Sequence, residues 1–302
     1  MVTNRLKMDF IIIGGQKTGS TFIHSILAKH PEVYTPMMEV PYLESPDYEN
    51  GGLLKLKELF EGQDSTRLWG IKRPNYLYNS IVTKRIKEHF PNTKLIICLR
   101  NPYQRFLSAY YHNINYGFLG AYSLNKGISM IINNNLPNKY KRAYEVLEFS
   151  KYSTHIKNYL DLFPKNNTLI LNFDDLKNGN KIKYIKQIYK FLNIEENFIP
   201  PNLNTKPQAV IYSIPRLRFL KLRNHFLYNY NTERTRLELK KQSIFDKIAI
   251  KLIEFTDRKL LCKLYTTSRP NIEFPKRLTE ILNLDIERLE NILSKDLSEW
   301  KI

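Results

Sequence analysis

The stretch that decides the fold reads Phe10-Ile-Ile-Ile-Gly-Gly-Gln-Lys-Thr-Gly-Ser-Thr-Phe-Ile-His-Ser-Ile-Leu27. A short apolar run stops at two glycines, a polar loop with a lysine follows, and an amphipathic pattern begins at Ser20. This order predicts a buried strand, a tight turn and a helix start. Such a helix start presents backbone N–H groups and the positive end of a dipole to an anion. The chain therefore opens with a phosphate-binding loop.

The spacing of Gly14 and Gly19 matches the P-loop pattern G-x-x-x-x-G, but Ser20 stands where the pattern requires a lysine. The lysine of this loop is Lys17, three positions earlier. A nucleoside triphosphatase of the P-loop class needs its lysine at the β- and γ-phosphates and an acidic residue for Mg²⁺. No predicted strand ends in a suitable aspartate. We therefore expect a phosphate compound that is bound without a metal ion.

A second segment reads Leu95-Ile-Ile-Cys-Leu-Arg-Asn-Pro-Tyr-Gln-Arg-Phe-Leu-Ser-Ala-Tyr110. Arg100 comes at the end of a predicted strand, Pro102 begins a helix, and Ser108 follows within that helix. Arginine offers a phosphate a charged, bidentate fork, and serine offers a short hydroxyl donor. We expect this pair to hold one compact dianion.

Short β-branched runs alternate with segments of helical period over the first two thirds of the chain. The expected strands cover residues 10–13, 33–35, 69–71, 95–99 and 169–172. The expected helices cover residues 20–29, 53–60, 81–90, 103–115, 144–163 and 181–192. This alternation predicts a parallel sheet covered on both faces, whose ligands gather at the carboxyl ends of the strands. A last helix is expected at residues 286–297, before Trp300.

Lysine and arginine number 47 against 29 acidic residues, which leaves a net charge of +18. Residues 216–260 alone hold twelve basic and five acidic side chains, in helical patterns. Such a field favours nucleic acid, nucleotides, acidic glycans or an anionic membrane. Lys, Asn, Ile and Tyr recur throughout the chain, so a biased composition explains the surplus equally well. The charge supports an anionic ligand without identifying it.

Cys98 lies in an apolar run and Cys262 in a helical one, and this distant pair predicts reduced, buried thiols rather than a disulfide. No zinc-binding spacing occurs. No apolar run is long enough for a secretory leader or a membrane span. We expect a cytoplasmic protein, with peripheral membrane association as an option. Residues 1–302 are expected to form one domain with a basic helical subregion at 214–270.

The two phosphate-binding segments, in this order, resemble the two cofactor signatures of the PAPS-dependent sulfotransferases (PAPS is 3′-phosphoadenosine-5′-phosphosulfate). Met38-Glu-Val-Pro-Tyr-Leu43 and Gly70-Ile-Lys-Arg-Pro-Asn-Tyr76 are similar to two segments of the heparan-sulfate-type branch. The C-terminal residues 285–300 resemble the last helix and tryptophan of the family. The chain departs from that branch at Pro41, where histidine is common, and at Arg73, where a small hydroxyl residue is usual.

The resemblance implies a role for each of these segments. The first loop would bind the 5′-phosphosulfate, and Lys17 would sit at the oxygen that bridges phosphate and sulfate. The other residues of this loop site would be Gly15, Gln16, Thr18, Gly19, Ser20 and Thr21. Glu39 would take the proton of the acceptor as general base, and Lys72 would bind the sulfuryl oxygens or orient Glu39.

The 3′-phosphate would lie on Arg100 and Ser108, and Lys206 and Arg216 would close a late loop over the nucleotide. His24 and His112 lie in helical segments, where we expect them to pack or to face solvent. His112 remains a remote candidate for the base, because another branch of the family uses histidine.

The resemblance implies a three-layer α/β/α sandwich related to the P-loop nucleotide kinases. The implied reaction moves a sulfuryl group from PAPS to a hydroxyl, or less readily an amine, without a metal. A glycan or glycolipid is the favoured acceptor. Two alternatives stay open: a metal-dependent nucleotide phosphotransferase, and a basic nucleic-acid-binding module on a nucleotide fold, although the chain carries no recognised nucleic-acid motif.

Overall fold

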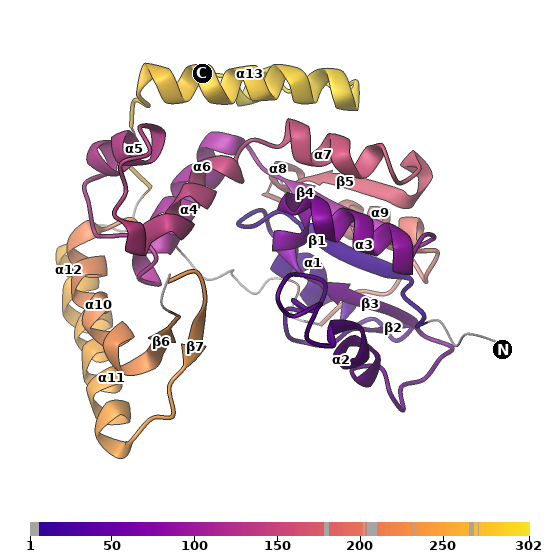
Figure 1. Ribbon diagram of the computed structural model, residues 1–302, viewed down its shortest axis with the longest axis horizontal. Helices are drawn as coiled ribbons and strands as arrows, with labels where there is room; N and C mark the ends of the chain where they lie inside the picture. Colours follow the sequence, from indigo (N-terminus) through magenta and orange to yellow (C-terminus); the bar gives the residue numbers. More distant parts are fainter. Residues whose placement is uncertain are drawn as a thin grey trace. The chain divides into compact units, whose positions relative to one another are not determined.

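The computed structural model describes residues 6–177, 181–201, 203, 210–231, 234–265, 269–270 and 272–302. Contacts divide the chain into two compact units (Figure 1). The first comprises Met1–Asn101, Tyr152–Pro207 and Arg288–Asp296. The second comprises Pro102–Lys151, Gln208–Glu287 and Leu297–Ile302.

The first unit contains a five-stranded sheet in which all strand pairs are parallel, in the order β2-β3-β1-β4-β5. The strands are β1 (Phe10–Gly14), β2 (Val33–Tyr34), β3 (Leu68–Lys72), β4 (Lys94–Leu99) and β5 (Thr168–Asn172). All five residues of β1 are buried, since this strand lies between β3 and β4 and is covered on both faces. The five strands predicted from the sequence are all present.

The two faces of this sheet are covered by different helices. Its helices are α1 (Ser20–Leu27), α2 (Gly52–Glu58), η1 (Pro74–Tyr78), α3 (Ser80–His89), α7 (Ser153–Leu160), η3 (Lys165–Asn167), α8 (Phe173–Lys177) and α9 (Lys181–Leu192). Phe10, Ile12 and Ile96 share a buried cluster with apolar side chains of α1 and α9. The helices α3 and α7 contact each other and cover the other face (Figure 1). The predicted three-layer α/β/α arrangement is confirmed.

The second unit is mostly helical. Its elements are α4 (Pro102–Asn115), α5 (Leu124–Ile132), η2 (Asn138–Tyr144), α6 (Glu145–Glu148), α10 (Ile214–Leu227), β6 (Tyr228–Tyr230), β7 (Leu237–Leu239), α11 (Ile244–Thr256), η4 (Asp257–Leu261), α12 (Cys262–Leu264), η5 (Ser298–Trp300) and most of α13 (Lys276–Leu293). Helices α10 and α11 pack together, and Ser243 and Asp246 form a capping box that begins α11. Within the described ranges, no helix combines the length and apolar character that a membrane span requires.

Two predicted helices are wrong in their extent. The segment 144–163 is not one helix, because it is interrupted after α6, where the buried Ser150 donates to the Val146 carbonyl and accepts from Arg105. The chain passes from the second unit to the first at this interruption. The last helix begins ten residues earlier than expected, at Lys276, and ends at Leu293, since Ser294 has a left-handed φ of 51°.

Two further expectations for the second unit are corrected. The sequence predicted no strand beyond residue 214, yet β6 and β7 form a short antiparallel hairpin. Each strand has only three residues, which is shorter than the four to eight residues over which an alternating pattern indicates a strand. Cys262 was expected to be buried, but it is exposed at the start of α12, whereas Cys98 is buried as predicted.

Candidate active site

The phosphate-binding loop leaves β1 at Gly14 and enters α1 at Ser20. Two buried hydrogen bonds hold the first turn of the loop. The Gly15 amide donates to the Cys98 carbonyl at 2.8 Å, and the Thr18 hydroxyl donates to the Gly15 carbonyl at 2.6 Å. The Cys98 thiol contacts the Thr18 carbonyl at 2.7 Å. Burial raises the pKa of this thiol to about 12, so Cys98 remains a neutral packing residue.

The loop ends in a conformation that only glycine adopts easily. Gly19 has a φ of 93°, and a Cβ atom there would lie 2.5 Å from the ring of Phe173. Gly19 precedes α1 without a side-chain cap. The first amides of a helix have no partner inside the helix, so they are available to an anion. Lys17 also has a positive φ, of 66°, in the middle of the loop.

Glu39, Lys72 and the phosphate loop are brought together in the first unit. The ammonium of Lys72, a buried residue at the end of β3, lies 3.0 Å from Glu39 Oε1 and donates to Thr21 Oγ1 at 3.0 Å. The side chain of Glu39 is 44% exposed. A buried ammonium thus links an accessible carboxylate to the N-terminus of α1. The arrangement allows proton transfer to the carboxylate beside a site of positive potential.

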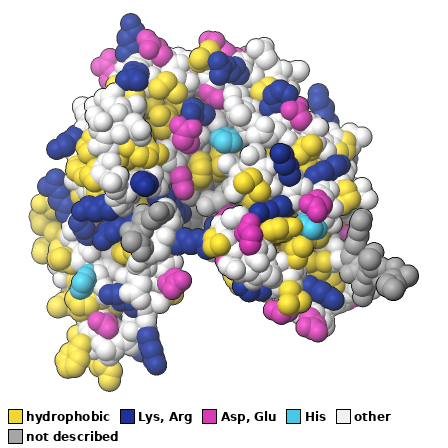
Figure 2. Space-filling view, in the orientation of Figure 1, with side chains coloured by type: hydrophobic (Ala, Val, Ile, Leu, Met, Phe, Trp, Pro, Cys, Tyr) yellow, Lys and Arg dark blue, Asp and Glu magenta, His cyan; other side chains and the backbone are white. Residues whose placement is uncertain are grey.

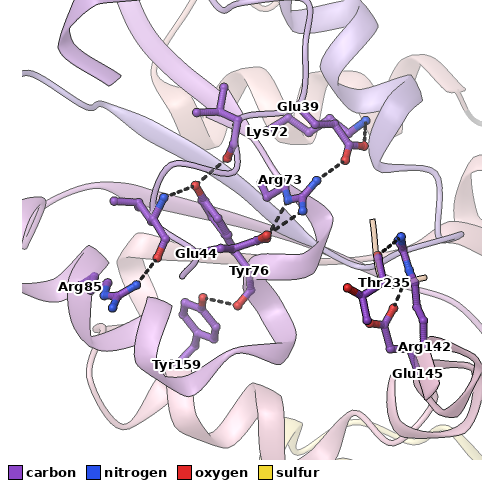
Figure 3. A network of polar contacts seen from close by, with 12 residues as sticks. Glu39, Glu44, Lys72, Arg73, Tyr76, Arg85, Arg142, Glu145, Tyr159 and Thr235 are labelled. Carbon is purple, nitrogen blue, oxygen red and sulfur yellow. Dashed lines mark hydrogen bonds and ion pairs between the residues drawn. The ribbon is translucent and has the colours of Figure 1, made fainter. Parts of the chain in front are cut away.

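The backbone around Glu39 is fastened to β3 and η1 (Figure 3). The Val40 amide donates to the Lys72 carbonyl at 3.1 Å. The Tyr76 hydroxyl donates to the Val40 carbonyl at 2.6 Å and accepts from the Leu43 amide at 3.1 Å. Burial raises the pKa of Tyr76, so its hydroxyl keeps the proton that it donates. These hydrogen bonds fix the backbone next to Glu39 and so restrict the position of its carboxylate.

Arg73 is a contact residue that the sequence did not assign to the site. Its Nη1 lies 3.2 Å from Glu39 Oε2, and its Nε and Nη2 both donate to Glu44 at 2.7 Å (Figure 3). Each oxygen of Glu39 therefore faces one cation, Lys72 or Arg73. The departure of Arg73 from the expected small hydroxyl residue was the one signal in the sequence that pointed to this position.

His24 lies close to these charges but is occupied within the core. It is buried on α1, and its Nε2 lies 3.0 Å from the Thr35 hydroxyl. Burial, with a smaller contribution from the nearby Lys72, lowers the pKa of His24 from 6.5 to about 4. The ring is therefore neutral at physiological pH. The packing role predicted for His24 agrees with this environment.

The proposed 3′-phosphate residues lie in different units. Arg100, in the first unit, donates from Nη1 to the Lys17 carbonyl at 3.3 Å, and its guanidinium lies 5.1 Å from the centre of the Phe173 ring. Ser108 lies in α4 of the second unit and is 1% exposed. Its hydroxyl has no hydrogen-bond partner among the residues that the structure describes. A buried donor without a partner is costly unless a ligand satisfies it.

The late loop residues are not brought to this site by any described contact. Arg216 lies in α10, where its Nε and Nη2 donate to the two carboxylate oxygens of Asp257 at 2.8 and 2.7 Å. Both side chains are buried. Lys206 falls outside the described residues. The roles predicted for these two residues toward the nucleotide therefore stay predictions.

Comparison with known proteins places the chain in a family. The model of the sulfotransferase domain matches residues 7–252. The chain belongs to the sulfotransferase family. This sulfotransferase is 29% identical over 201 residues to the human protein named bifunctional heparan sulfate N-deacetylase/N-sulfotransferase 2. The match covers 61% of the chain and 22% of that relative, so the chain spans about a fifth of its length.

Two other similarities agree with the family. The sulfotransferase is 34% identical over 111 residues to the membrane-associated sulfotransferase kil1 of Dictyostelium discoideum, covering 36% of the chain and 23% of that protein. The crystal structure of a sulfotransferase from Alicyclobacillus acidocaldarius superposes with a TM-score of 0.65 at 19% identity. It covers 98% of this chain and 99% of that one, which shows a shared fold. The predicted resemblance to heparan-sulfate-type sulfotransferases is confirmed.

Proposed function

We propose that this sulfotransferase moves a sulfuryl group from PAPS to a hydroxyl, or as a second option an amine, of a carbohydrate or glycolipid acceptor. The observation that carries the proposal is the contact of Lys72 with both Glu39 and Thr21. It joins a candidate base to the phosphate loop through one buried cation. The named relatives that act on heparan sulfate support a glycan acceptor.

The residues present fit PAPS as the donor. The N-terminus of α1 lacks a side-chain cap and offers amides to a phosphate. Ser108 is a buried hydroxyl whose hydrogen-bond partner is missing among the described residues, as expected for a residue that meets a ligand phosphate. Arg100 adds a permanent positive charge with a planar fork. We assign the 5′-phosphosulfate to residues 15–21. Arg100 of the first unit and Ser108 of the second are each proposed, separately, as residues that contact the 3′-phosphate.

When bound, PAPS supplies the sulfuryl group, whose S–O bond to the 5′-phosphate breaks as a bond to the acceptor oxygen forms. Glu39 takes the proton that the acceptor loses, which typically contributes about 10²–10⁴-fold in rate. Lys72 holds the carboxylate in place at Oε1. Lys17 stabilises the negative charge that develops on the leaving oxygen, and such stabilisation of the transition state raises kcat. The product is 3′,5′-ADP.

Two alternatives predict different ligands. A nucleotide phosphotransferase would prefer ATP with Mg²⁺, whereas a nucleic-acid-binding module would need neither nucleotide. The proposed enzyme acts without a metal, and we infer a cytoplasmic site of action, with peripheral contact to an anionic membrane as an additional feature. The family membership favours the sulfotransferase over both alternatives.

The first experiment is calorimetric titration with 3′,5′-ADP, 5′-AMP and ATP, without added metal. We expect micromolar binding that requires the 3′-phosphate. The Arg100→Ala variant should weaken 3′,5′-ADP much more than 5′-AMP, because only the former carries the group that Arg100 binds. Equal losses for both ligands, or a preference for ATP with Mg²⁺, would contradict the donor assignment.

The second experiment measures transfer by two variants with PAPS and a panel of glycan acceptors. Lys17→Ala should nearly abolish turnover, because the leaving oxygen loses its cation. Glu39→Gln should lower kcat by roughly 10²–10⁴-fold while 3′,5′-ADP still binds. Full activity of Glu39→Gln under conditions in which the chemical step limits the rate would exclude Glu39 as the base.

A further inference from the structure

An apolar stripe on α11 in the second unit faces solvent. It consists of Ile244, Phe245, Ile248, Leu252 and Phe255, whose exposed fractions are 75, 84, 58, 64 and 61%. Ile244, Ile248, Leu252 and Phe255 recur at the three- and four-residue spacing of one helix face. On α11 only Ile250 is fully buried against the rest of the unit. The stripe thus lies on the side of the helix that does not build the core.

The stripe continues beyond α11, because η4 and α12 follow without a gap as far as Leu264. Leu260 and Leu264 extend it and are 54 and 65% exposed. Figure 2 shows hydrophobic side chains beside basic ones at the left of the view, where Figure 1 places α10 to α12. Monomeric soluble proteins seldom expose a continuous apolar surface of this kind unless it meets a partner.

The charges around the stripe are distributed unequally. Lys247, Lys251 and Lys259 are exposed, and the two residues that follow Lys247 and Lys251 in the chain, Ile248 and Leu252, belong to the stripe. This outward surface of the helical segment therefore combines apolar and cationic side chains.

The acidic residues of the same segment are engaged with partners within the unit. Asp246 accepts hydrogen bonds from Ser243 at the helix start. Glu254 pairs with Arg223 and Arg258. The buried Asp257 pairs with Arg216. Arginines thus balance the charges of Glu254 and Asp257, and the lysines beside the stripe outnumber the one remaining carboxylate, Asp246, so that the surface keeps a net positive potential.

We propose that the segment 244–264 docks in the plane of an anionic lipid bilayer, with the apolar stripe among the acyl chains and the lysines at the headgroups. Helices that bind membranes in this way carry aromatic and aliphatic residues on one face and Lys or Arg beside it. A second copy of the chain would bring like charges together at the contact, which disfavours self-association. Nucleic acid would leave the phenylalanines uncovered.

The chain of residues 1–302 is mixed with vesicles of phosphatidylcholine alone, and with vesicles in which phosphatidylglycerol replaces one third of that lipid. We expect co-sedimentation with the anionic vesicles only, and weaker binding in high salt, since salt screens the lysine contribution. The measurement needs neither donor nor acceptor. It is therefore independent of the proposed transfer reaction.

The variant Phe245→Ser/Phe255→Ser should lower the partition coefficient by roughly tenfold or more, because two side chains no longer enter the apolar layer. Lys247→Ala/Lys251→Ala should lower it by roughly tenfold on anionic vesicles. Matched controls change exposed side chains of the first unit: Leu54→Ser/Ile81→Ser for the apolar pair and Lys55→Ala/Lys57→Ala for the basic pair. These controls should bind as the unchanged protein does.

Because Phe245 and Phe255 are exposed, their replacement should leave the thermal unfolding curve in place, which confirms that the variant is folded. The proposal is overturned if the unchanged protein does not bind anionic vesicles, or if the phenylalanine variant binds them equally well. A dimer in light scattering that dissociates in the phenylalanine variant, without vesicle binding, would assign the stripe to self-association instead. Binding that ignores both salt and the lysine changes would overturn the electrostatic part.

Discussion

At the scale of single residues, the carboxylate of Glu39 depends on two cations. Lys72 contacts Oε1 and Arg73 contacts Oε2, and Arg73 is itself held by two hydrogen bonds to Glu44. Hydrogen bonds between charged groups are shorter and stronger than neutral ones. We therefore expect Arg73 to act as a positioning residue for the proposed base.

The Arg73→Ser variant installs the small hydroxyl that is usual at this place in the family. We expect kcat to fall by roughly tenfold to a hundredfold, because Glu39 loses one of its two anchors. The affinity for 3′,5′-ADP should be unchanged, and Arg73→Lys should recover part of the rate. Initial rates at saturating PAPS and calorimetry with 3′,5′-ADP measure the two quantities.

Arg85→Ser is the matched control for this prediction. Arg85 is a similarly covered arginine of the same unit that pairs with Glu49 and does not contact Glu39. Its loss removes the same charge and a comparable ion pair. If both variants lower kcat equally, the effect of Arg73 comes from charge or folding rather than from the orientation of Glu39.

Candidate site residues could be named from the sequence when they lie together in one short segment. The spacing of Gly14, Lys17 and Gly19 was sufficient to predict the turn between β1 and α1, and the apolar run before Arg100 was sufficient to predict the end of β4, where we propose the phosphate sites. The anchoring of Arg73 was not predictable in the same way, because Glu44 lies 29 residues away in the sequence. Only the folded loop brings those two side chains together.

At the scale of elements, the strand–loop–helix unit requires glycine at the start of α1. Two helices of the first unit begin after a glycine with positive φ: Gly19 before α1, at 93°, and Gly51 before α2, at 80°. A Cβ atom at Gly19 would meet the Phe173 ring at 2.5 Å, whereas one at Gly51 would meet nothing within 4 Å. Comparing substitutions at Gly19 and Gly51 therefore separates the cost of backbone strain, which both share, from the cost of the clash with Phe173, which only Gly19 has.

We expect Gly51→Ala to cost roughly 1–2 kcal/mol in unfolding free energy, the usual penalty for a left-handed alanine. Gly19→Ala should cost more and should also weaken 3′,5′-ADP, because the clash with Phe173 displaces the amides of the loop. Urea unfolding and calorimetric titration of both variants check this. Equal stability losses with unchanged nucleotide affinity would mean that the Phe173 contact does not fix the loop.

Helices and strands were predictable where apolar residues are dense along the sequence. They were missed where contacts between residues far apart in the sequence determine where an element ends. Each predicted strand of the parallel sheet is present, since a strand buried on both faces is a nearly continuous apolar run. The helix expected at 144–163 is interrupted at Ser150. The hydroxyl of this residue accepts a hydrogen bond from Arg105 and donates one to the Val146 carbonyl. That contact joins residues 45 positions apart. Periodicity contains no information about such a partner.

At the scale of the whole molecule, amphipathic periodicity does not tell which face of a helix meets the core. The basic helical patterns after residue 214 were visible in the sequence, and an apolar stripe usually packs inward. In α11 the stripe lies outward, and the buried Asp257 contacts Arg216 on the inner side. The net charge of +18 favours a negatively charged partner. The position of the surface that would meet this partner follows only from the fold.

The stability of the molecule in acid should depend on His24. Its pKa is lowered from 6.5 to about 4 in the folded state, first by burial and then by Lys72. As the pH falls below 6.5, the unfolded chain takes up a proton that the native state does not, so stability decreases until about pH 4, where the native ring is protonated as well. The difference corresponds to roughly 3 kcal/mol at most.

The variant His24→Gln should flatten this dependence, because glutamine takes up no proton but still offers Thr35 a hydrogen bond. Urea unfolding of the first unit, followed near neutrality and at about pH 5, should show a smaller loss for the variant than for the unchanged protein. His225→Gln is the control, since this histidine is exposed on α10 and should leave the slope as it is. An equal slope in all three proteins would mean that acid destabilisation comes from general charge repulsion in a chain that already carries a large positive charge, and not from the buried ring beside Lys72.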